Sequence, residues 1–339
     1  MSNYQSQTFR QLSEYLDGGI SLCSFVSDCL QIGRSTAYKK INGTSSLSLE
    51  EFFKLVHRGN IPIGSLSQIT GHAMFQIDGI KRQTIDPLDY FRVILHHLGH
   101  LTTEDNIPFT YLSQEIPFYH LLNFPHLTSL KLFVWEVTNW NGQKRTTSLD
   151  LDNQHANLKA YNRVRTQLLD YYLQCPGVEI WKSSILDSTI EQIIYLLYSG
   201  LIKDRSTIDR LVRSLENLYT YLYDSCTSGY KINVNNPEKN NLHNIEVYYN
   251  SIVNTGNTII IKGEKTHRVY TMLDTPNYLN TSSNQVTDHI SAWVDNIIVH
   301  STKISREGNT ARRNYFRKLR MTLDQGLKEI NQLIRRQFD

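Results

Sequence analysis

Apolar residues near the start of the chain recur at the spacing of short amphipathic helices. Positions i, i+3, i+4 and i+7 lie on one face of a helix, and two sets of apolar residues follow this spacing, with a smaller set between them. The sets are Leu22, Phe25, Val26 and Cys29, then Ile32, Ala37 and Ile41, then Leu49, Phe52, Phe53 and Val56. The pattern predicts a compact helical domain that ends near Gly71.

From Pro87 to Asp224 the hydrophobic pattern remains mainly helical. Two helix starts in this region have the spacing of a capping box, in which a hydroxyl and an acidic side chain satisfy unpaired backbone donors reciprocally. The two predicted boxes are Ser188 with Glu191 and Ser206 with Asp209.

Near Gly229 the composition changes. Segments rich in β-branched and aromatic residues, separated by polar turns, indicate antiparallel strands. The expected strands are Ile245 to Tyr249, Thr258 to Lys262 and Arg268 to Leu273, and helices are expected from Val286 to Val299 and from about Thr310 to Phe338.

The first two apolar sets belong to a segment that meets the requirements of a helix-turn-helix. Such a motif needs an apolar first helix, a tight turn with an apolar plug, and a second helix with a small inward face and a polar outward face. Ala37 and Ile41 supply the inward face of the second helix. The residues expected on the turn and outer surface are Arg34, Ser35, Thr36, Tyr38, Lys39 and Lys40, with Asn42 following them.

This outer surface has chemistry suited to double-stranded DNA. Arg34 is placed to form a paired hydrogen bond with a guanine edge, a contact worth about 1 to 3 kcal/mol of discrimination. Lys39, Lys40, Lys54 and Arg58 are candidates for neutralising phosphates. Ser35, Thr36 and Asn42 are candidates for hydrogen bonds to phosphates or bases.

The segment RSTAYKKING, which begins at Arg34, resembles the helix-turn-helix of the phage-repressor-like family. By position, the resemblance implies base contacts from Arg34, Ser35 and Lys39, and backbone contacts near Lys40 and Asn42. Gly33 stands where that family often has Ser or Thr, so we expect a helix cap weaker by a few tenths of a kcal/mol. The segments from Ile107 to Trp135 and from Asn277 onward resemble parts of large bacterial helix-turn-helix regulators with an uncharacterised C-terminal region.

Composition and net charge neither exclude nor support the DNA-binding interpretation. The net charge of +3 is too mild to require a nucleic-acid partner. The four cysteines form no CxxC unit, so we expect no disulfide framework. No signal peptide or long apolar stretch is evident, so we expect a cytoplasmic protein without a membrane partner.

Two other function classes remain open. Arg92 and His97 have the Rx4H spacing of HEPN-type ribonucleases, although Val93 replaces the usual polar residue after the arginine. The second alternative is that the helical bundle serves as a protein-interaction adaptor. His96, His97 and His100 have no acidic or cysteine partner nearby, and no phosphate-loop or nucleophile-elbow motif occurs. We therefore expect no metal, no cofactor and no enzymatic activity.

The remaining candidate residues are aromatic or basic. Tyr248, Tyr249, Tyr270, Tyr278 and Trp293 are expected in the core, with a ligand pocket as the alternative. The terminal helix has an apolar stripe suited to packing or to a two-helix dimer seam. The stripe is Phe316, Leu319, Leu323, Leu327, Ile330 and Ile334, and the basic cluster near the helix start is Arg312, Arg313, Arg317, Lys318 and Arg320.

Together these patterns predict a mainly α (α+β) fold. We expect a helix-turn-helix DNA-binding domain in residues 1–75, a helical middle region in 76–228, and a small antiparallel β-containing domain with a long terminal helix in 229–339. The last domain is expected to serve sensing or dimerisation. The predicted function is a sequence-specific DNA-binding transcriptional regulator that acts as a homodimer and responds to a small-molecule effector.

Overall fold

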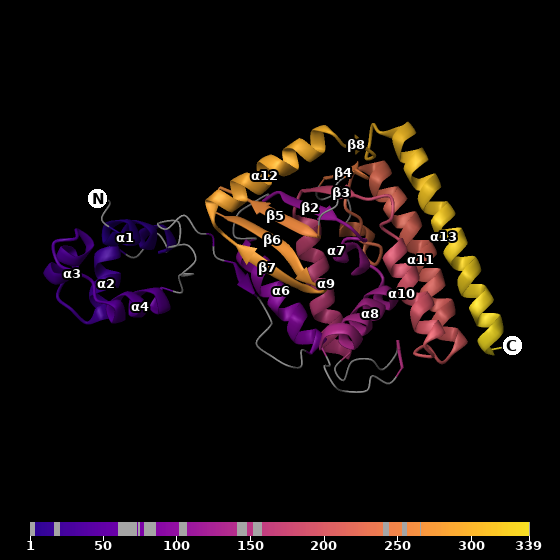
Figure 1. Ribbon diagram of the computed structural model, residues 1–339, viewed down its shortest axis with the longest axis horizontal. Helices are drawn as coiled ribbons and strands as arrows, with labels where there is room; N and C mark the ends of the chain where they lie inside the picture. The colour runs from indigo at the N-terminus through magenta and orange to yellow at the C-terminus, as the bar shows by residue number, and fades with distance from the viewer. Residues whose placement is uncertain are drawn as a thin grey trace. The chain divides into compact units, whose positions relative to one another are not determined.

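The computed structural model describes residues 4–16, 21–59, 73, 75–77, 86–101, 107–140, 148–151, 158–239, 244–252, 256–264 and 266–338. Contacts divide the chain into two units, one of Met1–Gln76 with Thr281–Asp288 and one of Ile77–Asn280 with His289–Asp339. Figure 1 shows the elements of each. The predicted end of the helical domain near Gly71 lies outside the described residues.

In residues 4–16 and 21–59, the first unit has four short helices around a small apolar core. They are α1 (Tyr4–Tyr15), α2 (Leu22–Leu30), α3 (Arg34–Ile41) and α4 (Leu49–Arg58). The core side chains are Phe9, Leu12, Val26, Ala37 and Leu55. This arrangement confirms the three predicted helical segments between Leu22 and Arg58.

The buried face of α4 differs from the predicted one. Leu49 and Phe53 are 71% and 48% exposed, whereas Leu55 and Val56 are buried. Ser48 begins this helix with a capping box, in which Ser48 Oγ accepts from Glu51 N (3.2 Å) and Glu51 Oε2 accepts from Ser48 N (2.8 Å). The apolar residues form a face that begins at Phe52 rather than at Leu49.

Among the described residues, eight strands form one mixed sheet in the order β1-β7-β6-β5-β2-β3-β4-β8. The strands are β1 (Gln76–Ile77), β2 (Phe109–Ser113), β3 (Gly177–Trp181), β4 (Ile245–Tyr249), β5 (Thr258–Lys262), β6 (His267–Asp274), β7 (Asn277–Thr281) and β8 (Thr302–Lys303). β2 and β4 each run parallel to β3, with Phe109 and Ile245 both opposite Gly177. β5 is antiparallel to β2 and to β6.

This sheet changes the expected layout of the chain. The predicted helical middle region supplies two central strands, β2 and β3, which pair with strands from the C-terminal region. The boundary expected at residue 228 therefore does not divide the structure. The strand Ile245–Tyr249 was expected to be antiparallel, but it pairs in parallel with β3 and is antiparallel only to the two residues of β8.

Helices cover both faces of the sheet. Val294 and Ile297 of α12 (Asn284–Val299) pack on Leu112, Ile180 and neighbouring side chains of one face. The other face lies under larger clusters to which the remaining long helices contribute. These helices are α6 (Pro87–Leu101), α8 (Pro125–Trp135), α9 (Leu158–Gln174), α10 (Asp187–Tyr198), α11 (Arg205–Ser228) and α13 (Asn309–Phe338). Shorter helical segments are α7 (Phe118–Leu121), a π-helix (Glu136–Trp140) and a 3₁₀ turn (Pro237–Lys239).

The two predicted capping boxes are wrong. Ser188 lies inside α10, which begins after Leu186, and no described side chain caps that helix. Asp204, rather than Ser206, caps α11 by accepting a hydrogen bond from Thr207 N (2.8 Å). An N-cap needs an extended backbone, and Asp204 has it (φ −130°, ψ 145°) whereas Ser206 is already helical.

The terminal helix α13 begins one residue before the predicted start. Its stripe packs inside the chain, with Phe316, Leu319 and Leu323 buried against α10 and α11 in the largest apolar cluster. Gly326 permits the close approach, since a Cβ at this position would lie 2.4 Å from Ile190 Cγ2. The stripe is therefore core and does not form a dimer seam. In the described part of the chain, no helix has the length and apolar character needed to span a bilayer.

Candidate nucleic-acid interface

The turn between α2 and α3 is held by backbone and hydroxyl hydrogen bonds. Gln31 ends α2 in the left-handed region (φ 55°). Ile32 N then donates to Ser27 O (3.1 Å), and Ser27 Oγ donates to Ile32 O (2.6 Å). Ile32 also packs against the core. The hydrogen bonds and this packing together fix the direction in which the chain enters α3.

Helix α3 begins as the sequence predicts, at Arg34 after an N-cap at Gly33. Gly33 is extended (φ −63°, ψ 148°), and α3 has no side-chain cap hydrogen bond. The first amide N–H groups of α3 are therefore not occupied by a capping side chain, as expected from the glycine.

The inward face of α3 contains one residue that was predicted to face outward. Ala37 is buried as expected, but Lys40 is also buried, with 8% exposure. Lys40 Nζ donates to Ser46 O (2.7 Å) and to Glu51 Oε2 (2.9 Å). The prediction that Lys40 contacts DNA is therefore corrected, because its charge is already paired inside the unit. The Lys40 charge and hydrogen bond also lower the pKa of Glu51.

The other six predicted contact residues are exposed. They are Arg34, Ser35, Thr36, Tyr38, Lys39 and Asn42. Ser35, Tyr38, Lys39 and Asn42 share one face, since they follow i, i+3, i+4 and i+7 spacing. Arg34 and Thr36 flank that face. The structure thus brings together a polar, basic surface, which we call the α3 surface.

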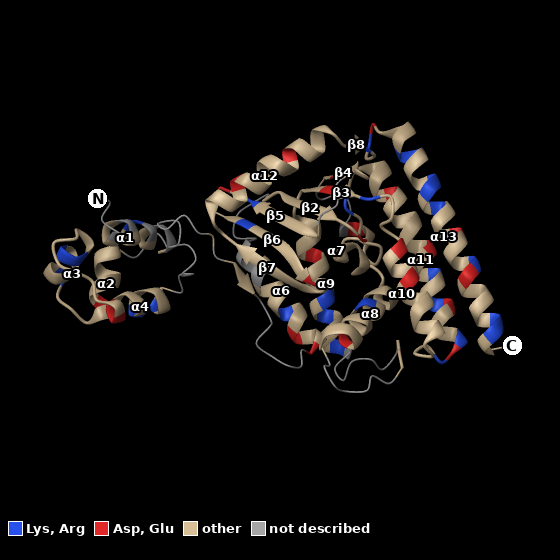
Figure 2. Cartoon of the chain, in the orientation of Figure 1, with Lys and Arg blue, Asp and Glu red and all other residues tan. Residues whose placement is uncertain are grey.

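Charged residues of α4 continue the basic character near the turn. Lys54 and Arg58 are exposed, and Cys29 Sγ at the end of α2 donates to Lys54 O (3.4 Å). Glu51 is engaged by Lys40, which leaves Glu50 as the exposed acidic residue of the first turn of α4. Figure 2 shows the basic residues on α3 and the acidic residues at the start of α4.

Sequence reasoning missed a residue that holds the end of α3. Gln5 of α1 donates from Nε2 to Lys40 O (2.6 Å) and Ser45 O (2.7 Å), and its Oε1 accepts from Leu47 N (2.9 Å). Three unpaired backbone groups near the C-terminus of α3 are thereby satisfied. Nothing in the local periodicity distinguishes Gln5, because its partners lie 35 to 42 residues away.

The remaining predicted candidates lie partly outside the side chains that the structure describes. Arg92 is exposed and pairs with Asp89 (3.1 Å), while the side chains of His97 and His100 lie outside those that the structure describes. Arg312 is buried and donates to Ile304 O and Arg306 O, whereas the other basic residues at the start of α13 are exposed.

All five C-terminal aromatic candidates pack in apolar clusters. Trp293 of α12 and Tyr248 pack in the same cluster, Tyr249 contacts Tyr315, and Tyr270 lies against the cluster on the other face of the sheet. Tyr278 also lines a cavity. When this chain is compared with protein-family models, with curated proteins and with solved structures, nothing matches.

Proposed function

We propose that this protein is a sequence-specific DNA-binding transcriptional regulator that reads the major groove with the α3 surface. The observation that supports this most is the exposure of Arg34, Ser35 and Lys39 on one short helix whose opposite face is packed. A reading helix needs this combination, because its inward face fixes its position while its outward face contacts base edges. The resemblance of the segment to phage-repressor-like proteins agrees with the proposal.

The chemistry of the α3 surface divides into two roles. Arg34 offers a planar pair of donors for a guanine edge, while Lys39 offers a single charge for a phosphate. The N-terminal amides of α3, which have no side-chain cap, are further donors for a phosphate oxygen. Lys40 takes no part in this proposal, because its ammonium group is paired with Glu51.

The test begins with the full chain and fragments of genomic DNA. Fragments that it retains are sequenced, and the selected site is compared with a scrambled site in a gel-shift assay at fixed salt. We expect Arg34→Ala with Lys39→Ala to lose selective retention, since each good base contact contributes about 1 to 3 kcal/mol.

The control removes the same charge elsewhere. Arg313 and Arg317 are exposed on α13, so Arg313→Ala with Arg317→Ala should leave selective retention intact. Equal retention by the wild type and the α3 variant would overturn the proposal, and so would an equal loss in the control.

The proposal places the protein in the cytoplasm. It also includes a homodimer, because two-fold symmetric regulators gain affinity from paired half-sites about one helical turn of DNA apart. Sedimentation of the full chain at micromolar concentration tests this step. A monomer both with and without the selected DNA would remove it, while the reading role of α3 would remain.

A further inference from the structure

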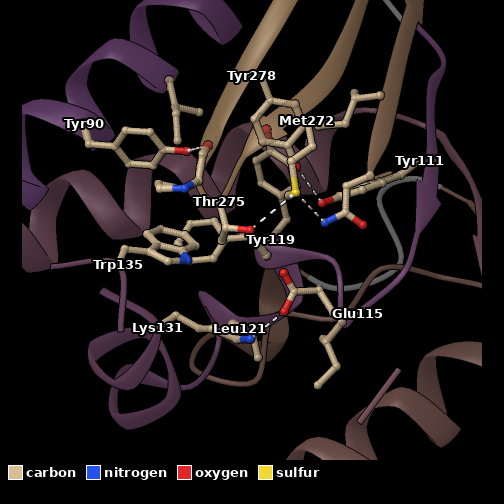
Figure 3. A pocket seen from close by; sticks show the side chains of 16 residues that line it. Tyr90, Tyr111, Glu115, Tyr119, Leu121, Lys131, Trp135, Met272, Thr275 and Tyr278 are labelled. Atoms are coloured by element: carbon tan, nitrogen blue, oxygen red, sulfur yellow. Dashed lines mark hydrogen bonds and ion pairs between the residues drawn. The ribbon is translucent and has the colours of Figure 1, made fainter. Parts of the chain in front are cut away.

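The second unit contains an aromatic cavity that the sequence pattern did not reveal. It lies among α6, the end of β2, α7, α8 and the β6–β7 hairpin, and its cavity volume is about 50 Å³. Six aromatic side chains line it, namely Tyr90, Tyr111, Phe118, Tyr119, Trp135 and Tyr278. Figure 3 shows most of these rings around a common space.

The aromatic walls are held by contacts within the chain. Tyr90 Oη donates to Pro276 O (2.8 Å), and the hydroxyl oxygens of Tyr111 and Tyr278 lie 3.2 Å apart. The Trp135 ring lies 4.9 Å from that of Phe118 and 5.7 Å from that of Tyr90. Burial raises the pKa of each lining tyrosine, so these hydroxyls stay neutral. The cavity is therefore preformed, with uncharged aromatic side chains on several sides.

An ion pair forms the floor of this cavity. Lys131 Nζ donates to Glu115 Oε2 (2.6 Å), and Ser188 Oγ donates to the same oxygen (3.1 Å). In Figure 3 one carboxylate oxygen of Glu115 lies on the bond to Lys131 and the other is directed toward the aromatic side chains. Burial raises the pKa of Glu115, but the Lys131 charge and the hydrogen bonds from Lys131 and Ser188 together outweigh it, so the net pKa is below its usual value and the carboxylate is ionised at neutral pH.

The two members of the pair differ in accessibility. The Glu115 side chain is 19% exposed, whereas that of Lys131 is 2% exposed. They are the only charged residues that line the cavity in the described part of the chain. An entering ligand therefore contacts the carboxylate rather than the ammonium group. An anion would be repelled by this carboxylate.

We propose that this cavity binds a small organic cation, whose ammonium group is surrounded by the aromatic rings and faces the free carboxylate oxygen of Glu115. Aromatic faces attract cations through their quadrupoles, and desolvation strengthens the attraction. This site lies within the second unit and goes beyond the proposed DNA-binding function. Either can fail without the other.

The test uses a cation and its neutral isostere. Choline and 3,3-dimethylbutan-1-ol have the same shape but differ in charge, so binding of each to the full chain by calorimetry separates cation recognition from apolar filling. We expect choline to bind at least about tenfold more tightly, a ratio that corresponds to about 1.4 kcal/mol. Equal affinities, or no choline binding at about 10 mM, would overturn the proposal.

Variants of the ion pair locate the bound charge. Glu115→Gln with Lys131→Met removes both charges without leaving one buried and unpaired, and should abolish the preference over the isostere. The matched control is Glu246→Gln with Lys303→Met, which removes a surface pair of 3.0 Å and should change neither affinity. Tryptophan fluorescence establishes that each variant is folded. An unchanged preference in the Glu115 double variant would place the cation elsewhere and overturn the proposal.

Discussion

The two units of this protein differ in how far water reaches their buried charged side chains. In the helical unit, the buried Lys40 is paired with Glu51, whose side chain is still 26% exposed. In the second unit, Glu179, His120 and Lys231 are 0%, 1% and 2% exposed. A small core leaves water within reach of its ion pairs, whereas a large core must satisfy each charge with protein groups.

Glu179 on β3 is the centre of the larger network. Its Oε2 lies 2.8 Å from His120 Nε2 and accepts from Trp181 Nε1 (2.7 Å), while Tyr172 Oη donates to Oε1. His120 Nδ1 lies 2.8 Å from the hydroxyl oxygen of Tyr221. Burial opposes the charge of Glu179, but these partners outweigh it and lower its pKa. The comparison therefore predicts large effects in the second unit and small effects in the first.

The largest expected effect is that of Glu179→Gln. After the substitution, three buried donors share the single acceptor oxygen of an amide. We therefore expect the free energy of unfolding to fall by about 3 to 5 kcal/mol. Urea unfolding followed by tryptophan fluorescence reports this, because Trp135, Trp140, Trp181 and Trp293 all lie in the second unit. Glu246→Gln, at a surface pair, should cost less than about 1 kcal/mol. Similar losses in both variants would contradict the comparison.

The next effect is a dependence on pH from Lys231, whose ammonium group donates to Tyr172 O (2.8 Å) and Cys175 O (2.7 Å). Burial lowers the pKa of Lys231 from 10.5 to about 8, partly offset by Glu179. Between these pH values the unfolded chain binds more protons, so this group makes stability rise with pH. We expect the wild type to gain about 2 kcal/mol relative to Lys231→Met between pH 8 and pH 10.

The difference between the two chains is the quantity to measure for Lys231. Burial raises the pKa of the Cys175 and Cys226 thiols, which makes stability fall with pH in the same range. That contribution is present in both chains and largely cancels. Parallel pH profiles of the wild type and Lys231→Met would show that the folded and unfolded chains protonate Lys231 alike.

A smaller effect is expected for Lys40→Met in the helical unit. Glu51 keeps both water and its hydrogen bond from Ser48, so the loss of stability should be about 1 kcal/mol, measured by amide hydrogen exchange around Leu55. Lys39→Met should leave exchange unchanged and reduce the salt dependence of DNA binding by about one phosphate contact. If instead Lys39→Met speeds amide exchange and Lys40→Met reduces the salt dependence, then Lys40 rather than Lys39 contacts DNA.

The smallest expected effect is that of Gly33→Ser. A Cβ at this position meets nothing within 4 Å, and the extended backbone suits an N-cap. The new hydroxyl should accept a hydrogen bond in the first turn of α3 and stabilise the unit by a few tenths of a kcal/mol. Slower amide exchange in α3 would support this, whereas faster exchange would indicate that the glycine relieves a contact.

Sequence patterns predicted the local elements of the helical unit well. The segments from Leu22 to Arg58 have helical periodicity, and Gly33 marks the start of α3 because its position precedes a short amphipathic repeat. Periodicity did not predict that Lys40 turns inward. Its partners, Ser46 and Glu51, belong to the following loop and helix, so their contribution depends on how α4 packs.

The second unit was less predictable, because its central features join distant segments. β2 and β3 were read as parts of a helical region, since five-residue apolar strands between helices have too few positions to show a period of two. The cavity joins Tyr90 of α6, Glu115 of the loop after β2, Lys131 of α8 and Tyr278 of β7. Each residue taken alone is typical of an ordinary core or surface position.

The sequence by itself therefore determined the short helices between Leu22 and Arg58, the terminal helix and the mixture of helix and strand, because these follow from hydrophobic spacing within a dozen residues. Only the tertiary structure decided which charges are buried, which strands are neighbours and which aromatic rings share a cavity. Those outcomes depend on the exclusion of water by residues far apart in the chain, and no local pattern records that exclusion.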